Sequence, residues 1–434
     1  MSRLDTLGEK MMPIANKIGG NLYLTVLRDA FMLAFPLTMF GSFVVVFNNL
    51  PFWPDSLKST FSNLFGAGQN ATMSIMAVFV TFGIGYYLSK AKGVEGIFGG
   101  AVAFASFLIL TPLTTDYVDE KTGKVLGQVQ AIDLSRLGAK GMFVAMIAAF
   151  IAASIYIALT KKGFVIKMPD GVPPAVAKSF SALIPAFGAL AFFMFVNAIV
   201  GGVFNTNVAD EVYKWIQMPL VGIGTSYPGT MIAMFLTLFL WFFGLHGQII
   251  VNSICEPLWN TNSLLNLDIK KKLASNVIHH SDGAKIVTKA FMDTFTVQLG
   301  GTGMTLVVAI ILAFGIKKAQ MRNIGRLGLA PGLFNVNEPI IFGLPIVLNA
   351  QVLIPWLLAP LVVTTVNYFA MWTNLVPCTT GAQVPWTIPI VISGFLATNS
   401  VLGSLLQIID FAIVGIIWWP FLKLMDREPD TSKL

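Results

Sequence analysis

A single carboxylate, Glu338, stands in a long apolar stretch of this 434-residue sequence. Between Leu327 and Ile409 no other residue is Asp, Glu, Lys or Arg. An ionised side chain at membrane depth costs roughly 2.5 to 3.5 kcal/mol, so a carboxylate retained there is a candidate functional group. The alternative is that Glu338 lies at a membrane surface where the chain turns between two spans. The basic segment 317–326 already marks such a surface, which weighs against this alternative.

Residues that interrupt regular helices surround Glu338, namely Pro331, Gly332, Pro339, Gly343 and Pro345. Irregular backbone inside a bilayer persists only where it is buried in protein or lines a cavity. Asn335 and Asn337 place amide donors and acceptors beside the carboxylate, and a polyhydroxylated ligand needs both. The stretch therefore predicts a polar binding site for a sugar-like ligand.

A second candidate site is the sequence Gly-Leu-His-Gly-Gln at 244–248. His246 is the one side chain between Lys214 and Glu256 that ionises near neutral pH. Gly247 allows close approach of a ligand, and Gln248 adds an amide. A histidine inside a helical bundle also serves as a hydrogen-bonded packing residue, so both roles stay open.

Trp386 lies in a further interrupted segment, Gln383-Val-Pro-Trp-Thr387. Its ring can stack on a pyranose while the indole N–H binds a hydroxyl, but it can equally be a tryptophan of the interfacial belt. The segment Gly300–Gly303 lacks the Gly-Lys-Ser/Thr of a nucleotide-binding loop, so we interpret it as a helix break or a close helix contact. His279 and His280 lack further ligands at the spacing of a metal site. We expect no metal and no cofactor.

Composition indicates the class of protein that carries these groups. Hydrophobic residues make up 55% of the chain and charged residues 11%, whereas charged residues reach about a quarter in soluble proteins. Long apolar runs, rather than alternating ten-residue segments, favour helices over a β-barrel. The net charge of +7 comes from basic residues between apolar runs, so it fits membrane topology and not nucleic-acid binding.

The expected fold is an all-α polytopic membrane protein with about ten transmembrane helices, two re-entrant or hairpin-like elements and amphipathic helices. The segments 252–301 and 376–400 are the expected re-entrant or broken elements, because they are too polar or too rich in Pro and Gly for plain spans. Predicted spans lie at about 24–47, 71–89, 97–113, 139–160, 180–204, 228–252, 352–374 and 401–424. If 302–315 also crosses the membrane, part of 252–301 must change sides.

The chain divides near residue 205 into two predicted domains. Residues 1–205 contain regular spans and form a scaffold and dimerisation half, whereas residues 206–434 contain the interrupted helices and form the substrate-binding half. The alternation of basic connecting segments predicts a cytoplasmic amino terminus. A run of small residues predicts a homodimer contact in the first half: Gly99, Gly100, Ala101, Ala103 and Ala105.

The sequence Asn337-Glu338-Pro339-Ile340 and the following Phe-Gly-Leu-Pro-Ile-Val-Leu-Asn349 resemble the signature of enzyme IIC, the membrane component of bacterial phosphotransferase-system sugar transporters. The similarity covers essentially the whole chain and is strongest to the cellobiose/chitobiose type within the lactose/cellobiose/N,N'-diacetylchitobiose branch. It implies ten spans, a homodimer and a multi-pass location in the bacterial cytoplasmic membrane. It also implies that Glu338 and His246 contact a sugar, and it favours a sugar contact for Trp386.

The resemblance implies a permease that binds a β-linked disaccharide and presents its 6-hydroxyl to phosphorylated enzyme IIB. We expect IIB as a separate polypeptide, and membrane lipid but no nucleic acid as further partners. Glu338 would hold the hydroxyl, and whether it also accepts the proton or only positions the group stays open. The predicted substrate-binding residues are His246, Asn337, Trp386, Gly247, Gln248 and Asn335. Whether the chain counts as an enzyme stays open, because phosphorylation requires IIB. The alternative is an ion-coupled secondary oligosaccharide transporter in which Glu338 is the coupling site.

Overall fold

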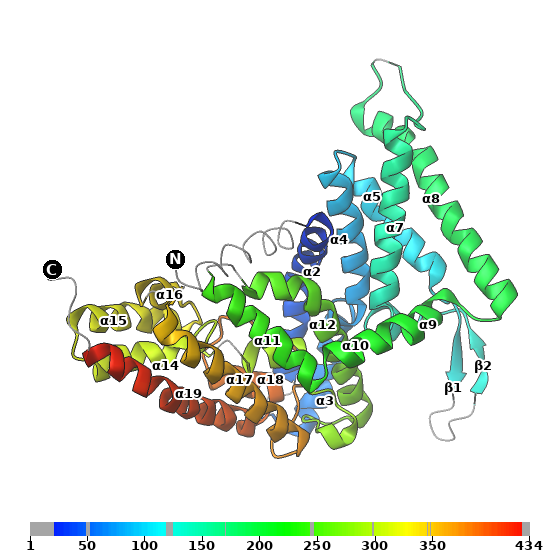
Figure 1. Cartoon of the computed structure of the whole chain (residues 1–434). Helices are drawn as coiled ribbons and strands as arrows, with labels where there is room; N and C mark the ends of the chain where they lie inside the picture. Colours follow the sequence, from blue (N-terminus) through cyan, green and yellow to red (C-terminus); the bar gives the residue numbers. More distant parts are fainter. Residues whose placement is uncertain are drawn as a thin grey trace. The chain divides into compact units, whose positions relative to one another are not determined.

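The computed structural model describes residues 21–48, 53–118, 125–169, 171–243, 247–296, 299–344, 346–347 and 349–427 (Figure 1). The regular secondary structure of these residues is almost entirely helical, which confirms the predicted class. The sequence analysis did not predict the antiparallel hairpin of β1 (Thr115–Val118) and β2 (Val125–Val129). Gln128 Nε2 donates to Asp116 Oδ1 across this hairpin at 3.1 Å.

The chain packs into two compact units. The amino-terminal unit contains Asn21–Gly41 and Leu64–Gly222, and the carboxy-terminal unit contains Ser42–Asn63 and Ile223–Leu434. The predicted domain boundary near residue 205 remains a prediction. The compact units differ from it because they assign 206–222 to the amino-terminal unit and a segment of the first half to the carboxy-terminal one.

The amino-terminal unit is a helical bundle in which α4 (Met76–Ala91) packs on α5 (Gly96–Leu110) and α7 (Met142–Lys161), and α8 (Pro174–Phe204) packs on α5 and α7 (Figure 1). Three helices cross the boundaries between the units: α2 (Leu22–Asn48), α3 (Asp55–Asn70) and α10 (Met218–Gly224). The remaining elements of this part are η1 (Met73–Ile75), α6 (Leu134–Leu137), α9 (Val208–Val212) and η2 (Tyr213–Gln217).

Three of the small residues of α5 pack within the chain. A Cβ added to Gly99 would lie 2.7 Å from the carbonyl oxygen of Gly85 on α4, and one added to Gly100 would lie 2.8 Å from the ring of Phe82. Ala103 is fully buried. Gly99, Gly100 and Ala103 bring α5 close to α4, whereas Ala101 is exposed and Ala105 is half-buried. The homodimer itself remains a prediction.

The carboxy-terminal unit combines long helices with several short ones. Its long helices are α11 (Tyr227–Phe242), α12 (Gly247–Leu273), α15 (Ala319–Leu333), α17 (Ala350–Trp372) and α19 (Val401–Arg427). Between them lie η3 (His280–Asp282), α13 (Lys289–Thr294), α14 (Thr305–Ile310), the π-helical turn η4 (Ile311–Gly315), α16 (Glu338–Gly343) and α18 (Ile392–Thr398).

Helix α12 differs from the sequence expectation, which ended a span near residue 252 and treated the following region as re-entrant. The helix runs through this polar region because its amides bind backbone within the protein instead of water. Asn262 Nδ2 donates to Val287 O at 2.8 Å, and Asn266 Nδ2 donates to Thr379 O at 2.8 Å. Both asparagines are almost fully buried.

Within the described residues, five helical segments are long and apolar enough to cross a membrane, or six if the bent pair Val208–Gly224 and Tyr227–Phe242 forms one span. The five are Ser59–Ala91, Met142–Lys161, Pro174–Phe204, Gln351–Trp372 and Val401–Arg427. Shorter apolar helices cover Gly96–Leu110 and Thr305–Gly315. The architecture is that of a multi-pass membrane protein, and the number of about ten spans stays a prediction.

Candidate functional site

The predicted site residues come from three separated segments of the carboxy-terminal unit. Gly247 and Gln248 begin α12, Asn335 and Asn337 lie between α15 and α16, and Trp386 lies between α17 and α18. His246 lies outside the described residues. The backbone of Glu338 begins α16, with Asn337 as the N-cap residue, while its side chain lies outside the description.

The glycine loop, residues 300–304, connects these segments. Asn335 is buried, and its Oδ1 accepts from the backbone N–H of Gly300 at 2.8 Å. Its Nδ2 donates to the carbonyl oxygens of Trp386 and of Ile388, the latter at 3.0 Å. One amide thus ties the turn before Glu338 to the glycine loop and to the Trp386 segment, and its donors and acceptor are all engaged with backbone.

Asn337 fixes the same loop from the position next to Glu338. Its Nδ2 donates to the carbonyl oxygen of Thr302 at 2.6 Å and to Thr305 Oγ1 at 2.9 Å. Thr305 Oγ1 in turn donates to Gly300 O at 2.9 Å. Asn337 and Thr305 are both buried, so these bonds are made away from bulk water.

The backbone of the glycine loop explains why glycine is needed there. Gly300, Gly301 and Gly303 have φ values of +85°, +92° and +85°, which favour glycine. A Cβ on Gly301 would lie 2.4 Å from Asn337 Cγ, so the loop also requires close approach at this point. The interpretation of this segment as a break and close contact is confirmed. Its position among the predicted site residues was not anticipated.

The start of α12 approaches the loop from another side. Thr302 Oγ1 donates to Gln248 Oε1 at 3.5 Å, and Gln248 is half-buried. Gly247 has a packing role, because a Cβ there would lie 2.1 Å from the carbonyl oxygen of Thr237 on α11. The structure therefore brings Gln248 to the same loop as Asn335 and Asn337.

Trp386 has an accessible ring. Its residue surface is 46% exposed, while its backbone carbonyl accepts from Asn335. An exposed indole held through its backbone can offer a flat apolar face to a pyranose ring. The predicted sugar contact remains a proposal.

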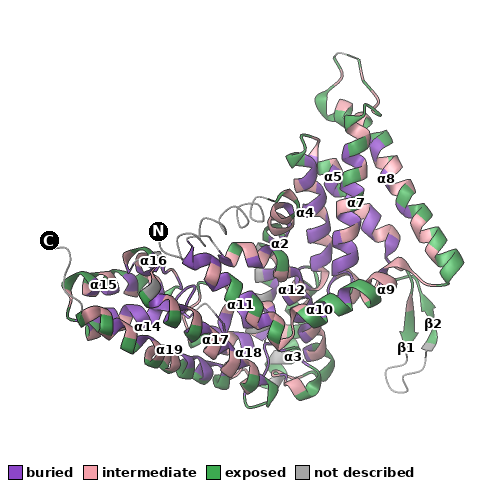
Figure 2. Ribbon diagram, in the orientation of Figure 1, coloured by how far each residue is buried: buried purple, intermediate pink, exposed green. Residues whose placement is uncertain are grey.

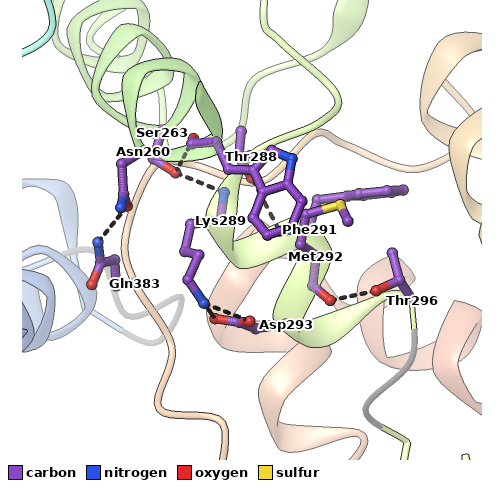
Figure 3. A network of polar contacts seen from close by, with 10 residues as sticks. Asn260, Ser263, Thr288, Lys289, Phe291, Met292, Asp293, Thr296 and Gln383 are labelled. Carbon is purple, nitrogen blue, oxygen red and sulfur yellow. Dashed lines mark hydrogen bonds and ion pairs between the residues drawn. The ribbon is translucent and has the colours of Figure 1, made fainter. Parts of the chain in front are cut away.

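A polar network that the sequence analysis did not assign to the site joins α12, α13 and Gln383 of the segment that holds Trp386 (Figure 3). On α13, Lys289 Nζ contacts the two carboxylate oxygens of Asp293 at 2.7 and 2.5 Å, with both side chains 13% exposed. Glu256 on α12 interacts electrostatically with both members of this pair. The i, i+4 spacing of Lys289 and Asp293 is visible in the sequence, but their burial is not.

The network connects α12 to the segment of Trp386. Gln383 Nε2 donates to Asn260 Oδ1 at 2.9 Å, and the backbone N–H of Lys289 donates to Ser263 Oγ at 3.1 Å (Figure 3). Thr288 caps α13 by accepting from Phe291 N at 3.0 Å. Hydrogen bonds therefore link the Trp386 segment to α12 through Gln383 and Asn260, and α13 to α12 through Lys289 and Ser263. Among the described residues, no group of three or more His, Cys, Asp or Glu is arranged to hold a metal ion.

Comparison with known proteins identifies the family. The profile of the family described as Phosphotransferase system, EIIC matches residues 28–360. The chain is 52% identical over 427 residues to the oligo-beta-mannoside-specific EIIC component of Bacillus subtilis, an alignment that covers 98% of this chain and 94% of that protein. It is 36% identical to the cellobiose-specific EIIC component of Geobacillus stearothermophilus, covering 97% of this chain and 94% of that one.

A solved structure agrees with these relatives. The crystal structure of the transporter ChbC, the IIC component from the N,N'-diacetylchitobiose-specific phosphotransferase system, superposes with a TM-score of 0.88. The two chains are 34% identical, and the match covers 97% of this chain and 98% of ChbC. The fold, the family profile and the relatives lead to one assignment, that this chain belongs to the EIIC family of the phosphotransferase system.

Proposed function

We propose that this protein is the sugar-specific permease of a phosphotransferase system and that it transports a β-linked disaccharide of the cellobiose or diacetylchitobiose class. The relatives named above are specific for oligo-β-mannoside, cellobiose and N,N'-diacetylchitobiose, which are β-linked oligosaccharides. The observation that carries the proposal within this chain is the convergence of Gln248, Asn335, Asn337 and the Trp386 segment on one loop beside Glu338.

In the proposed site, Glu338 accepts a hydrogen bond from the 6-hydroxyl of the sugar. When the phosphoryl group moves from phosphorylated EIIB to this hydroxyl oxygen, Glu338 takes the hydroxyl proton. His246 and Gln248 orient the sugar, and Trp386 stacks against a pyranose ring. Asn335 and Asn337 contribute by holding the glycine loop, because their Nδ2 donors already bind protein groups.

The proposed partners follow from the reaction. A separate EIIB protein supplies the phosphoryl group, membrane lipid surrounds the apolar helices, and two copies of the chain form a homodimer. The amino terminus lies on the cytoplasmic side of the bacterial membrane, as the distribution of Lys and Arg favours. No nucleic acid is involved.

The test is the chemical form of the imported sugar. Cells that express this chain with its EIIB and the general phosphocarrier proteins should accumulate the disaccharide as its 6-phosphate. Cells that lack the phosphocarrier proteins should fail to accumulate it. Accumulation of free sugar in those cells, abolished by an uncoupler, would instead support the ion-coupled transporter with Glu338 as its coupling site.

A further inference from the structure

We propose that Thr305 is a positioning residue for the reacting hydroxyl, acting on Glu338 through Asn337. This inference rests on the proposed function, in which Glu338 holds the 6-hydroxyl. Thr305 lies on α14, far along the chain from Glu338 and without assignment in the site predicted from the sequence. Its hydroxyl joins the two sides of the glycine loop to the residue that precedes the catalytic carboxylate.

The Thr305 hydroxyl has both of its hydrogen-bonding roles engaged. The oxygen accepts from Asn337 Nδ2 at 2.9 Å, and the hydrogen is donated to Gly300 O at 2.9 Å. The residue is fully buried, so water does not replace a bond that is lost. Thr305 therefore fixes two positions at once, that of Gly300 at the start of the loop and that of the Asn337 amide.

The position of Asn337 bears directly on Glu338. Asn337 is the N-cap residue of α16, and Glu338 is the first residue of that helix. The N–H groups of Ile340 and Ile341 bind the carbonyl oxygen of Asn337 at 2.9 and 3.0 Å. The side chain of Asn337 binds the glycine loop, and its backbone begins α16. A shift of the Asn337 side-chain amide therefore also moves the backbone of Glu338.

The glycine loop needs this support because its conformation is unfavourable. Met304, directly before Thr305, has a φ of +60° although it is not glycine, and it is fully buried. Such residues persist where the surroundings over-determine the backbone. The bond from Thr305 Oγ1 to Gly300 O closes the loop across Met304. Without the hydroxyl, the loop and Asn337 lose a shared constraint.

Loss of this constraint should affect chemistry more than binding. A misplacement of roughly 1 Å can cost about a hundredfold in rate, because the reacting groups no longer meet in the productive geometry. His246 and Trp386, which lie on other segments, would still hold the sugar. The expected signature of a Thr305 defect is a low turnover at saturating sugar with little change in affinity.

The experiment compares three variants by sugar binding and by phosphorylation with phosphorylated EIIB. Thr305→Val keeps the shape and removes both hydrogen bonds, and Thr305→Ser restores the hydroxyl. Thr364→Val is the matched control, because Thr364 is fully buried and its hydroxyl has no hydrogen-bond partner among the described residues. It lies on α17 and outside the proposed site.

We expect Thr305→Val to lower turnover about 10- to 100-fold while the dissociation constant of the sugar changes by less than about threefold. Thr305→Ser and Thr364→Val should behave as wild type. Wild-type turnover in Thr305→Val, or a serine variant as impaired as the valine variant, would overturn the inference. If Thr305→Val does not fold, Asn337→Asp decides, because it removes the Nδ2 donor to Thr305 Oγ1 together with the same donor's bond to Thr302 O. Wild-type turnover in that variant also overturns the inference, and lost turnover with retained binding supports it.

These outcomes are separable from failure of the proposed function. If the wild-type protein with phosphorylated EIIB forms no sugar phosphate, then the function is wrong whatever the variants do. If wild type is active and Thr305→Val is equally active, then only the positioning role is wrong.

Discussion

Glu338 has two tasks in the proposed site, and substitution separates them. A hydrogen bond between a carboxylate and a sugar hydroxyl contributes on the order of 1.5 to 3 kcal/mol, because one partner is charged. Glu338→Gln keeps an acceptor oxygen but removes the charge and the basicity. We therefore expect weaker sugar binding together with loss of phosphorylation, measured side by side on purified protein. Wild-type sugar binding and wild-type phosphorylation in this variant would instead support the alternative, in which Glu338 lies at a membrane surface.

Two further variants sharpen this test. Glu338→Asp retracts the carboxylate by roughly 1 Å, so it should impair turnover even where binding remains. His246→Ala should lower affinity while leaving measurable phosphorylation at saturating sugar, provided that His246 only orients the substrate.

The buried ion pair on α13 supports a prediction about stability. Removing one partner of a buried pair typically costs about 3 to 5 kcal/mol, because the other charge is left uncompensated. Lys289→Met leaves two acids, Asp293 and Glu256, without their cation, whereas Asp293→Leu leaves Lys289 beside Glu256. We expect Lys289→Met to lower the thermal stability in detergent most, Asp293→Leu less, and the double variant less than Lys289→Met alone.

The exposed pair of Lys178 and Glu95 provides the control. Its N–O distance of 2.8 Å resembles that of the buried pair, but the side chains are 58% and 35% exposed. Exposed pairs contribute at most about 1 kcal/mol, so Lys178→Met should change stability little. An equal loss of thermal stability in Lys178→Met and Lys289→Met would show that burial does not increase the contribution of the pair to stability.

At the scale of single residues, the sequence alone was enough to identify Asn335, Gln248 and Trp386 as candidate site residues. They stand out because they are polar or amphipathic residues in apolar segments interrupted by Pro and Gly, and the fold brings them to one loop. It did not identify Thr305. A threonine at the start of an apolar helix has no distinguishing pattern in the sequence, and its role depends on a contact with Asn337. Such contacts are fixed by tertiary packing alone.

At the scale of elements, the end of α19 holds the turn that leads from η4 into α15. The backbone N–H groups of Lys317 and Lys318 both donate to Asp426 Oδ1 at 3.0 Å. Lys318 Nζ reaches Met425 O at 2.6 Å, and Lys423 Nζ reaches Gly315 O at 2.6 Å. The acidic side chain therefore binds two adjacent donors at a junction of three elements.

This junction predicts the effect of removing Asp426. Asp426→Ala leaves two backbone donors without their acceptor and should lower the free energy of unfolding by about 1 to 3 kcal/mol. Asp426→Asn keeps an amide oxygen at the same place, so it should retain most of the stability. Thermal unfolding of both variants in detergent is the measurement. Equal stability of the alanine variant and wild type would mean that water satisfies these donors as well as Asp426 does.

The lengths of apolar helices were predictable from the sequence. The length of a helix with polar residues was not, because those residues are buried by tertiary contacts. The predicted spans at 139–160, 352–374 and 401–424 correspond to α7, α17 and α19 within a few residues. The long helix α12 was missed because the polarity of residues 252–301 indicated a re-entrant segment, whereas Asn262 and Asn266 of this region bind backbone inside the protein. Sequence alone does not tell a buried amide with partners from an exposed one.

At the scale of the whole molecule, α8 presents an apolar face that its own chain leaves uncovered. Of its 31 residues, only Ala182, Pro185, Ala189 and Phe193 are buried (Figure 2). Exposed apolar residues recur at a spacing of four or eight along the helix: Leu183, Phe187, Phe195, Ile199 and Val203. Such a stripe on a transmembrane helix meets either lipid or a second copy of the chain.

We predict that the homodimer forms in the amino-terminal unit and that this face of α8 takes part in it. Single cysteines at Phe187 or Ile199, in a variant in which Cys255 and Cys378 are replaced and sugar uptake is retained, should cross-link into dimers in membranes. A cysteine at Ile416 on α19, a position that is 74% exposed, is the matched control in the carboxy-terminal unit and should cross-link poorly. Efficient cross-linking at Ile416 with none at the α8 positions would make the assignment of the dimer contact wrong, because the α8 face would then be covered by acyl chains.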